Sequence, residues 1–305
     1  MEMRAIISQL AILFFLLALG YAGFKIKALT AEAGKVLTKV VFSITLPATI
    51  LGSAIGGDLD ISGTETAIFM LLVVLVYIIY IAIALPVARI LGKGKPLRGL
   101  FAFMLIYSNV GFMGLPVTAA IFGPEAVFFN ALFNMPNWIT AFSFGTVLIS
   151  GKMDRFSPKT LLNPVIIASF LMIPIALSGF RAPDVIVEAV SLTGNITVPA
   201  SMFVIGITLA QEPIKGVFTN WRLYPLAFVK LIIIPVVIWL VFRPFVQSEL
   251  TLGLLVVLSA MPTAAMSAMF AIEYDNNANL ASNGVFLTTL LSGITIPLIM
   301  FFLLV

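Results

Sequence analysis

One stretch of the chain, residues 107–116, combines a polar side chain with residues that interrupt a helix. It contains Asn109, Gly111, Gly114 and Pro116 within an otherwise apolar run. Glycine and proline are poor at continuing a helix, and the Asn109 amide can donate to a carboxylate without itself carrying charge. We predict a broken helix here, with these four residues in a substrate-binding site. An ordinary proline kink is the alternative.

A second stretch, residues 259–267, has the same character. Pro262 lies between Ser259 and Thr263, so hydroxyl groups flank the residue that interrupts the helix. A half-helix that begins at such a break directs free N–H groups and a partial positive charge into the space beyond it, which favours an anion. We therefore predict that Ser259, Pro262 and Thr263 also bind substrate, with a plain kink again as the alternative.

Lys230 falls near the middle of an apolar run at residues 221–242. Its side chain is too short to reach a bilayer surface about 15 Å away, and an unpaired ammonium there costs at least about 2.5–3.5 kcal/mol. Lys230 is therefore predicted to meet either the charge of a bound substrate or backbone carbonyls freed at a helix break. The sequence leaves both roles open, and we include Lys230 among the substrate-binding candidates.

The amino-acid composition excludes most other kinds of functional site. The chain of 305 residues has no Cys and no His, which excludes disulfides, thiolate nucleophiles and histidine-based catalysis. Hydrophobic residues make up 61% of it and charged residues 10%, too few charges to cover a soluble surface. We predict an integral membrane protein that is not an enzyme and has no metal or other cofactor. Because the basic residues lie in short loops between apolar runs, nucleic acid is not an expected partner.

Ten apolar runs are each long enough to cross a bilayer as a helix, which takes about 20 residues. They cover residues 4–23, 35–55, 67–88, 101–122, 126–149, 160–178, 186–209, 221–242, 251–272 and 281–304. The predicted fold class is an all-α membrane protein, one multi-pass domain over residues 1–305. The two interrupted stretches fall near the middle of the fourth and ninth runs, at the expected bilayer centre. No Asp or Glu lies comparably deep, so an anionic substrate is preferred over a cation.

The two halves of the chain resemble each other. Residues 43–50 in the second run and 195–202 in the seventh share Ile, Thr, Pro and Ala in the same order, so that Pro47 corresponds to Pro199. Because each half has five spans, an odd number, the second half would cross the membrane in the opposite sense. We predict two inverted five-helix repeats, residues 1–150 and 151–305, as in secondary transporters whose substrate sites lie near the midplane.

Basic residues concentrate in one set of alternating loops, which predicts orientation. Thirteen lie there: Lys25, Lys27, Lys35, Lys39, Arg89, Lys93, Lys95, Arg98, Lys152, Arg155, Lys159, Lys215 and Arg222. The opposite set has only Arg4, Arg181 and Arg243, among acidic residues such as Asp58 and Asp60. We expect both termini on the non-cytoplasmic side of the cell (inner) membrane.

In these features the chain resembles the auxin efflux carrier family, in particular its bacterial branch. The resemblance rests on residues 109–116, 260–263, 270–274 and 280–282, on Lys230 followed by Pro235, and on Leu46 with Pro47. The family includes bacterial permeases for malate, malonate and related carboxylates, and plant exporters of indole-acetic acid. The short loop at residues 150–159 is similar to that of the bacterial members.

The resemblance implies the fold of sodium/proton antiporters and bile-acid symporters, in which helices 4 and 9 are broken and cross. It also implies a scaffold of helices 1, 2, 6 and 7, a mobile transport unit of helices 3–5 and 8–10, and a homodimer formed through the scaffold. Ser259 and Thr263 stand near the second break in place of an asparagine, so a site of two asparagines is not implied.

These observations favour a secondary transporter, a permease or efflux carrier, that moves a small organic carboxylate anion across the cell membrane by alternating access. One alternative is a sodium-coupled symporter of an amphipathic organic anion. Another is a passive anion channel, which would conduct without counterflow.

Overall fold

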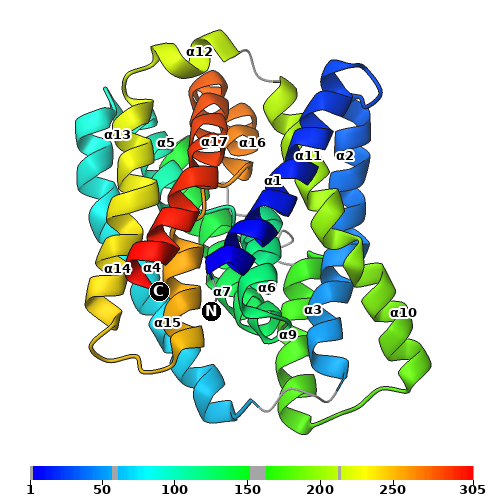
Figure 1. Ribbon diagram of the computed structural model, residues 1–305. Helices are drawn as coiled ribbons and strands as arrows, with labels where there is room; N and C mark the ends of the chain where they lie inside the picture. Colours follow the sequence, from blue (N-terminus) through cyan, green and yellow to red (C-terminus); the bar gives the residue numbers. More distant parts are fainter. Residues whose placement is uncertain (1–2, 57–60, 152–162, 212–213, 305) are drawn as a thin grey trace.

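The protein is an all-helical membrane protein in the part of the chain that the computed structural model describes, residues 3–56, 61–151, 163–211 and 214–304 (Figure 1). Over those residues the only β-type pairing is one isolated bridge, between Ser108 and Thr263. Six helical segments are long and apolar enough to cross a membrane: Ile7–Lys25, Ala31–Ile55, Gly63–Leu91, Asp184–Gln211, Leu223–Phe242 and Ala278–Leu303. The predictions of an all-α fold and of a multi-pass membrane protein are confirmed at this level.

Helical residues occupy each of the ten predicted spans. In the first half, the elements are α1 (Met3–Lys25), α2 (Ala31–Val40), η1 (Val41–Thr45), α3 (Leu46–Ile55), α4 (Gly63–Leu91), α5 (Lys95–Ile106), η2 (Val110–Gly114), α6 (Leu115–Phe122), α7 (Glu125–Thr140), η3 (Ala141–Gly145) and α8 (Thr146–Ser150). Elements labelled η are single π-helical turns, and η1 and η3 continue directly into the helices on either side.

The second half has the elements α9 (Pro164–Ser178), α10 (Asp184–Asn195), α11 (Thr197–Gln211), α12 (Ile214–Thr219), α13 (Leu223–Phe228), η6 (Val229–Ile233), α14 (Ile234–Phe242), α15 (Glu249–Ser259), α16 (Met266–Glu273) and α17 (Ala278–Leu303). That these elements make ten crossings in two inverted repeats stays a prediction, as does the orientation. Of the residues used to predict orientation, Asp58, Asp60, Lys152, Arg155 and Lys159 lie outside the described residues, as does most of the 150–159 loop.

Polar residues set where several of these helices begin. Ser62 forms a capping box at the start of α4: its hydroxyl accepts from the Glu65 N–H at 3.1 Å, and the Glu65 carboxylate accepts from the Ser62 N–H at 2.9 Å. Asn163, Ser248 and Asn277 cap α9, α15 and α17 through their side-chain oxygens. Such caps satisfy N–H groups that have no partner within the helix.

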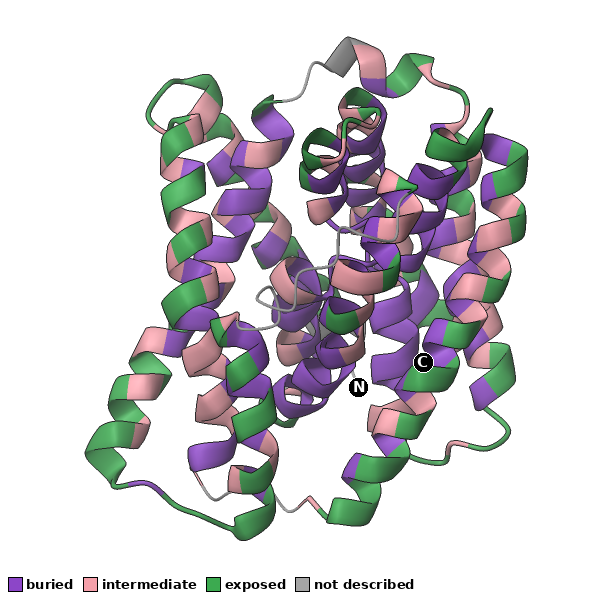
Figure 2. Ribbon diagram, turned by 180° about the vertical axis from the view of Figure 1, so that it is seen from behind, coloured by how far each residue is buried: buried purple, intermediate pink, exposed green. Residues whose placement is uncertain are grey.

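The helices form two groups that lie side by side in Figure 1. In one group α1 packs along α11, α3 packs against α9 and α10, and α2 packs against α11. Gly20 permits the close approach of α1 and α11, since a Cβ there would lie 2.7 Å from the Phe203 carbonyl oxygen. In the other group, α4 packs on α5, α5 on α8, α14 on α15 and α16 on α17. Figure 2 shows buried residues concentrated where helices meet and exposed residues on the outer helices.

The two similar stretches found in the sequence contact each other within the first group. Thr49 belongs to the 43–50 stretch and Thr197 to the 195–202 stretch. The Thr49 hydroxyl lies 2.8 Å from the Thr197 hydroxyl and 3.0 Å from the Gly194 carbonyl oxygen. A Cβ at Gly194 would lie 3.1 Å from the Thr49 hydroxyl oxygen, so the helices cross closely at this point. The crossing therefore brings corresponding parts of the two halves together.

Candidate functional site

Both stretches that the sequence predicts to be broken lie in gaps between helices, and they cross. The backbone leaves helical geometry between α5 and η2 and again between α15 and α16. The Asn109 N–H donates to the Pro262 carbonyl at 2.8 Å, and the Ala264 N–H donates to the Tyr107 carbonyl at 3.0 Å. Each unwound segment thus satisfies part of the other's backbone, which is what buried, non-helical chain at membrane depth requires.

Lys230, from η6, caps the carbonyl end of α5. Its Nζ donates to the Leu105 carbonyl at 2.8 Å and to the Ser108 hydroxyl at 2.6 Å, and the side chain is fully buried. The Thr263 hydroxyl donates to the neighbouring Met104 carbonyl at 3.0 Å. A cation suits the partial negative charge at this end of a helix. Of the two roles that the sequence leaves open for Lys230, this geometry corresponds to the carbonyl cap.

The carbonyl end of α15 is held in a similar way by Tyr80 of α4. The Tyr80 hydroxyl donates to the Ser259 hydroxyl at 2.6 Å, and Ser259 donates to the Leu255 carbonyl at 2.5 Å. The Tyr80 ring centre lies 5.4 Å from the Lys230 Nζ, within cation–π range. Tyr80 and Lys230 therefore join the carbonyl ends of both broken helices on one side of the crossing.

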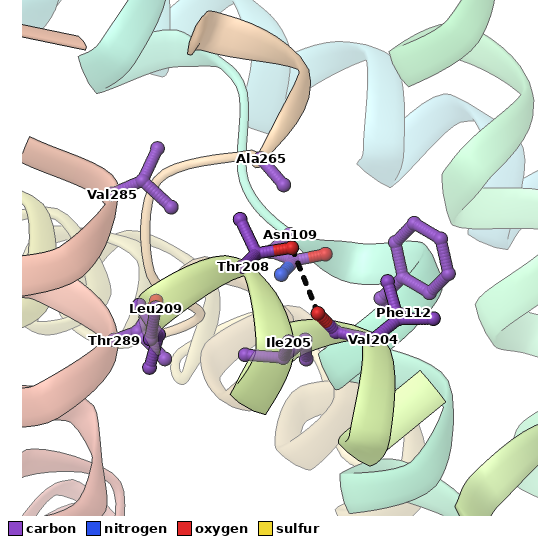
Figure 3. Close-up of a pocket in the computed structure, with 9 residues that line it drawn as sticks. All are labelled: Asn109, Phe112, Val204, Ile205, Thr208, Leu209, Ala265, Val285 and Thr289. Atoms are coloured by element: carbon purple, nitrogen blue, oxygen red, sulfur yellow. Dashed lines mark hydrogen bonds between the residues drawn. The ribbon is translucent and has the colours of Figure 1, made fainter. Parts of the chain in front are cut away.

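The opposite half-helices begin at the edge of a cavity at the crossing, which encloses about 290 Å³ when the space open to solvent is included. Neither start has a side-chain cap: Asn109 precedes η2 and Ala265 precedes α16 without forming one. We call this space the main cavity. It is lined by Asn109, Phe112, Val204, Ile205, Thr208, Leu209, Ala265, Val285 and Thr289, which come from both groups of helices (Figure 3).

Three polar side chains line the main cavity, and two of them have no protein partner. Asn109 is 5% exposed, and its amide forms no hydrogen bond with the described residues. The Thr289 hydroxyl on α17 is fully buried and likewise unpaired within the described chain. Thr208 differs, because it donates to the Val204 carbonyl at 2.8 Å (Figure 3). Unpaired buried polar groups are costly, so the cavity is suited to a ligand that hydrogen-bonds to Asn109 and Thr289.

The other sequence-predicted site residues occupy different places. Gly114 packs on α15, since a Cβ there would lie 2.9 Å from the Leu258 Cδ2 atom, and Pro116 is buried in the first turn of α6. Pro262, Thr263 and Ser259 are engaged in the backbone pairing and helix-end contacts described above. Of the eight predicted residues, Asn109 alone lines the main cavity. The binding role of the others stays a prediction.

Gly111 lines a second, small cavity, together with Leu46, Ile50, Leu115, Asn134, Trp138 and Val165. The Asn134 Oδ1 and Trp138 Nε1 atoms are buried there without partners among the described residues. The Asn134 amide nitrogen donates to the Asn130 side chain at 2.7 Å, and Asn130 donates to Thr118 at 3.3 Å. We did not predict these α7 amides from the sequence, although polar side chains at helical spacing in an apolar run are a usable signal of function.

The sequence was also compared with known protein families and with individual proteins. A family model described as "Membrane transport protein" matches residues 5–158 and 152–300. An uncharacterized transporter of Methanocaldococcus jannaschii is 25% identical over 302 residues, covering 94% of this chain and 95% of that protein. An uncharacterized transporter of Methanothermobacter thermautotrophicus is 26% identical over 289 residues, covering 93% of each chain.

Proposed function

This chain belongs to the membrane transport protein family, and we propose that it is a secondary transporter that moves organic carboxylate anions across the cell membrane by alternating access. It is thus a multi-pass transport protein and not an enzyme. One observation supports the anionic substrate above others. Two uncapped helix starts and the unpaired Asn109 amide lie at one buried cavity where the broken helices cross.

The electrostatics of the crossing favour an anion. The carbonyl ends of α5 and α15 carry partial negative charge, and they are covered by Lys230, Thr263 and Ser259. The amino ends of η2 and α16 carry partial positive charge and lie at the main cavity. A carboxylate there would accept hydrogen bonds from Asn109 and Thr289 as well as from backbone N–H groups. A cation would meet no acidic side chain, because none lines the cavity.

Alternating access is supported by the internal resemblance of the two halves. We propose ten crossings in two inverted five-helix repeats, residues 1–150 and 151–305. The paired breaks lie in the fourth and ninth segments, which correspond in the two repeats, and the similar stretches at Thr49 and Thr197 are in contact. In inverted-repeat transporters, exchanging the conformations of the repeats opens the site to the other side.

The grouping of the helices supports a division of the protein into a fixed unit and a mobile unit. We propose that the group containing α1, α2, α3 and α9–α11 is the scaffold and that the group containing α4–α8 and α13–α17 is the transport unit. Both cavities lie between the groups: α11 faces Asn109 and Phe112 in one, and α3 faces Gly111 and Trp138 in the other. A homodimer through the scaffold, and termini on the non-cytoplasmic side, complete the proposal.

Asn109→Ala tests the site directly. The variant should bind a carboxylate about 1–3 kcal/mol more weakly, because it loses one hydrogen-bond donor to a charged group. This corresponds to roughly 5- to 150-fold in Kd. Asn283→Ala is a matched control, since Asn283 on α17 lines neither cavity. Binding is measured as a ligand-dependent rise in melting temperature. Unchanged affinity in folded Asn109→Ala protein would remove Asn109 from the site.

Thr289→Val removes the second unpaired group with little change in side-chain shape. We expect carboxylate binding to weaken by about 1–2 kcal/mol, roughly tenfold. Thr295→Val is the control, because the Thr295 hydroxyl is also buried and unpaired on α17 but lies outside both cavities. Equal effects of the two substitutions would show that the loss reflects the helix and not the cavity.

A carrier and a channel differ in counterflow. Proteoliposomes loaded with unlabelled anion should take up labelled anion against its gradient if the protein is a carrier. The same vesicles, with and without a sodium gradient, test the sodium-coupled alternative. Anion flux without counterflow would contradict alternating access.

A further inference from the structure

We propose that the ring of Phe42 is a latch that stabilises the present arrangement of scaffold and transport unit and has no counterpart in the opposite-facing state. The inference rests on the proposed function, since it takes the two groups of helices as units that move relative to each other. It goes further because it predicts that the two facing states differ in free energy, and it names the contact that sets the difference.

Phe42 lies between two rings of the proposed transport unit. Its ring centre is 4.7 Å from that of Phe112 and 5.5 Å from that of Trp138, and both contacts are edge-to-face, with angles of 84° and 81° between the ring planes. Aromatic pairs favour this geometry, because the positive edge of one ring meets the negative face of the other. Phe112 also lies at the main cavity (Figure 3). We call Phe42, Phe112 and Trp138 the aromatic latch.

The aromatic latch joins the two groups of helices. Phe42 lies in η1, between α2 and α3 of the proposed scaffold, whereas Phe112 and Trp138 lie in η2 and α7 of the proposed transport unit. The other ring pairs between described residues all lie within the transport unit. Phe42 therefore makes the ring contacts that have to separate when the two units move relative to each other.

The local backbone and the burial of these rings fit a contact that can open. Phe42 and Phe112 each lie in a single π-helical turn, a feature found frequently at functional sites. Both side chains are only partly buried, whereas Phe69, which pairs with Phe129 inside the transport unit, is almost completely buried. Separation of Phe42 from Phe112 would therefore not leave a cavity in a packed core, which would be costly.

The counterpart of Phe42 in the second proposed repeat is a glycine. Phe42 stands five residues before Pro47, and Gly194 stands five residues before Pro199. Gly194 packs directly on Thr49, since a Cβ there would lie 3.1 Å from the Thr49 hydroxyl oxygen, and this packing leaves no room for a ring. The two repeats thus differ at this position in both size and chemistry.

The counterparts of the other two rings are not aromatic either. The two backbone bonds between the broken segments exchange places if position 107 corresponds to position 262, and that register pairs Phe112 with Ser267. Trp138 and Leu291 each stand 13 residues after the first residue of their helices, α7 and α17. When the repeats exchange conformations, the contact equivalent to the latch is made by glycine, serine and leucine. The opposite-facing state therefore lacks two edge-to-face ring pairs and is less stable for that reason.

Distances between two spin labels test the latch on the full chain. The labels are attached at Val36→Cys on α2 and Ile272→Cys on α16, positions that are 55% and 68% exposed. Since the native chain has no Cys, no other site is labelled. One label thus lies on each unit, and double electron–electron resonance gives the fraction of molecules in each state. Phe42→Leu keeps an apolar side chain but removes both ring pairs. It should raise the ratio of the opposite-facing to the present state by roughly 5- to 150-fold.

Phe69→Leu is the matched control, because it removes a ring pair within the transport unit, whose centres lie 4.8 Å apart. It should leave the ratio of the two states unchanged. An unchanged ratio in folded Phe42→Leu protein would overturn the latch, and so would an equal shift in Phe69→Leu protein. If Phe42→Leu protein does not fold, Trp138→Leu removes one of the two latch pairs and should shift the ratio in the same direction by roughly two- to tenfold. Either negative result leaves the proposed function standing, because counterflow tests that function separately.

Discussion

Cross-linking α1 to α17 is expected to abolish transport while leaving anion binding intact. The variant carries Phe14→Cys and Gly293→Cys, joined by a short thiol-reactive cross-linker. A Cβ at position 293 would lie 3.0 Å from the Phe14 Cε1 atom, so the two sites are close. Because the native chain has no Cys, the reagent reacts only at the introduced residues. Neither Phe14 nor Gly293 lines either of the two cavities described above.

Transport should be lost because α1 belongs to the proposed scaffold and α17 to the proposed transport unit. A covalent cross-link between the two helices prevents the relative movement that alternating access requires, but it does not alter Asn109 or Thr289. Uptake into proteoliposomes measures transport, and ligand-dependent melting of the same cross-linked sample measures binding. The loss of transport should be essentially complete in the fraction of molecules that are cross-linked.

A cross-link between two helices of the proposed scaffold provides the control. Ser53→Cys and Met172→Cys join α3 to α9, where the Ser53 hydroxyl lies 3.7 Å from the Met172 sulfur. This pair should leave transport unchanged, because both helices belong to the same group. Undiminished uptake by fully cross-linked 14/293 protein would contradict the moving-unit proposal. Loss of uptake in both cross-linked proteins would assign the effect to the treatment.

The all-helical membrane fold was predictable from hydropathy because the same physical constraint acts on every segment in a bilayer. An apolar run of sufficient length has to form a helix, since its backbone has no other hydrogen-bond partners in lipid. The two breaks were predictable for a related reason: glycine and proline weaken a helix wherever they occur. The pairing of Asn109 with Pro262 was harder to predict, because it depends on how two segments about 150 residues apart in the chain cross.

The site was only partly predictable, because a side chain's partners depend on its neighbours in space. Ser259 and Thr263 looked like ligand groups beside a break, yet their hydroxyls donate to the Leu255 and Met104 carbonyls. Thr289 lies next to Thr288 in an apolar helix, and nothing in the sequence distinguishes the two. In the structure Thr288 donates to the Gly284 carbonyl, whereas Thr289 is unpaired at the cavity.

Lys230→Met is expected to destabilise the fold and to leave anion affinity nearly unchanged. Methionine preserves an unbranched stem of similar length, so packing around α13–α14 changes little. The Leu105 carbonyl, however, loses the ammonium that donates to it at 2.8 Å. An orphaned buried carbonyl costs about 1–3 kcal/mol, and the partial negative charge at the end of α5 loses its cation. The free energy of unfolding should fall by at least this amount, as measured by denaturant titration in detergent.

Two further variants separate this role from a general effect of charge. Lys39→Met removes an exposed positive charge and should leave stability unchanged within about 0.5 kcal/mol. Ser108→Ala removes the other acceptor of Lys230, at 2.6 Å. Combined with Lys230→Met, it should show a coupling of about 0.5–3 kcal/mol, as expected for groups in one hydrogen-bond network. The opposite pattern, full stability with anion binding lost, would assign Lys230 to the substrate. The crossing would then need another group to hold the carbonyl end of α5, and none of the described residues provides a second cation there.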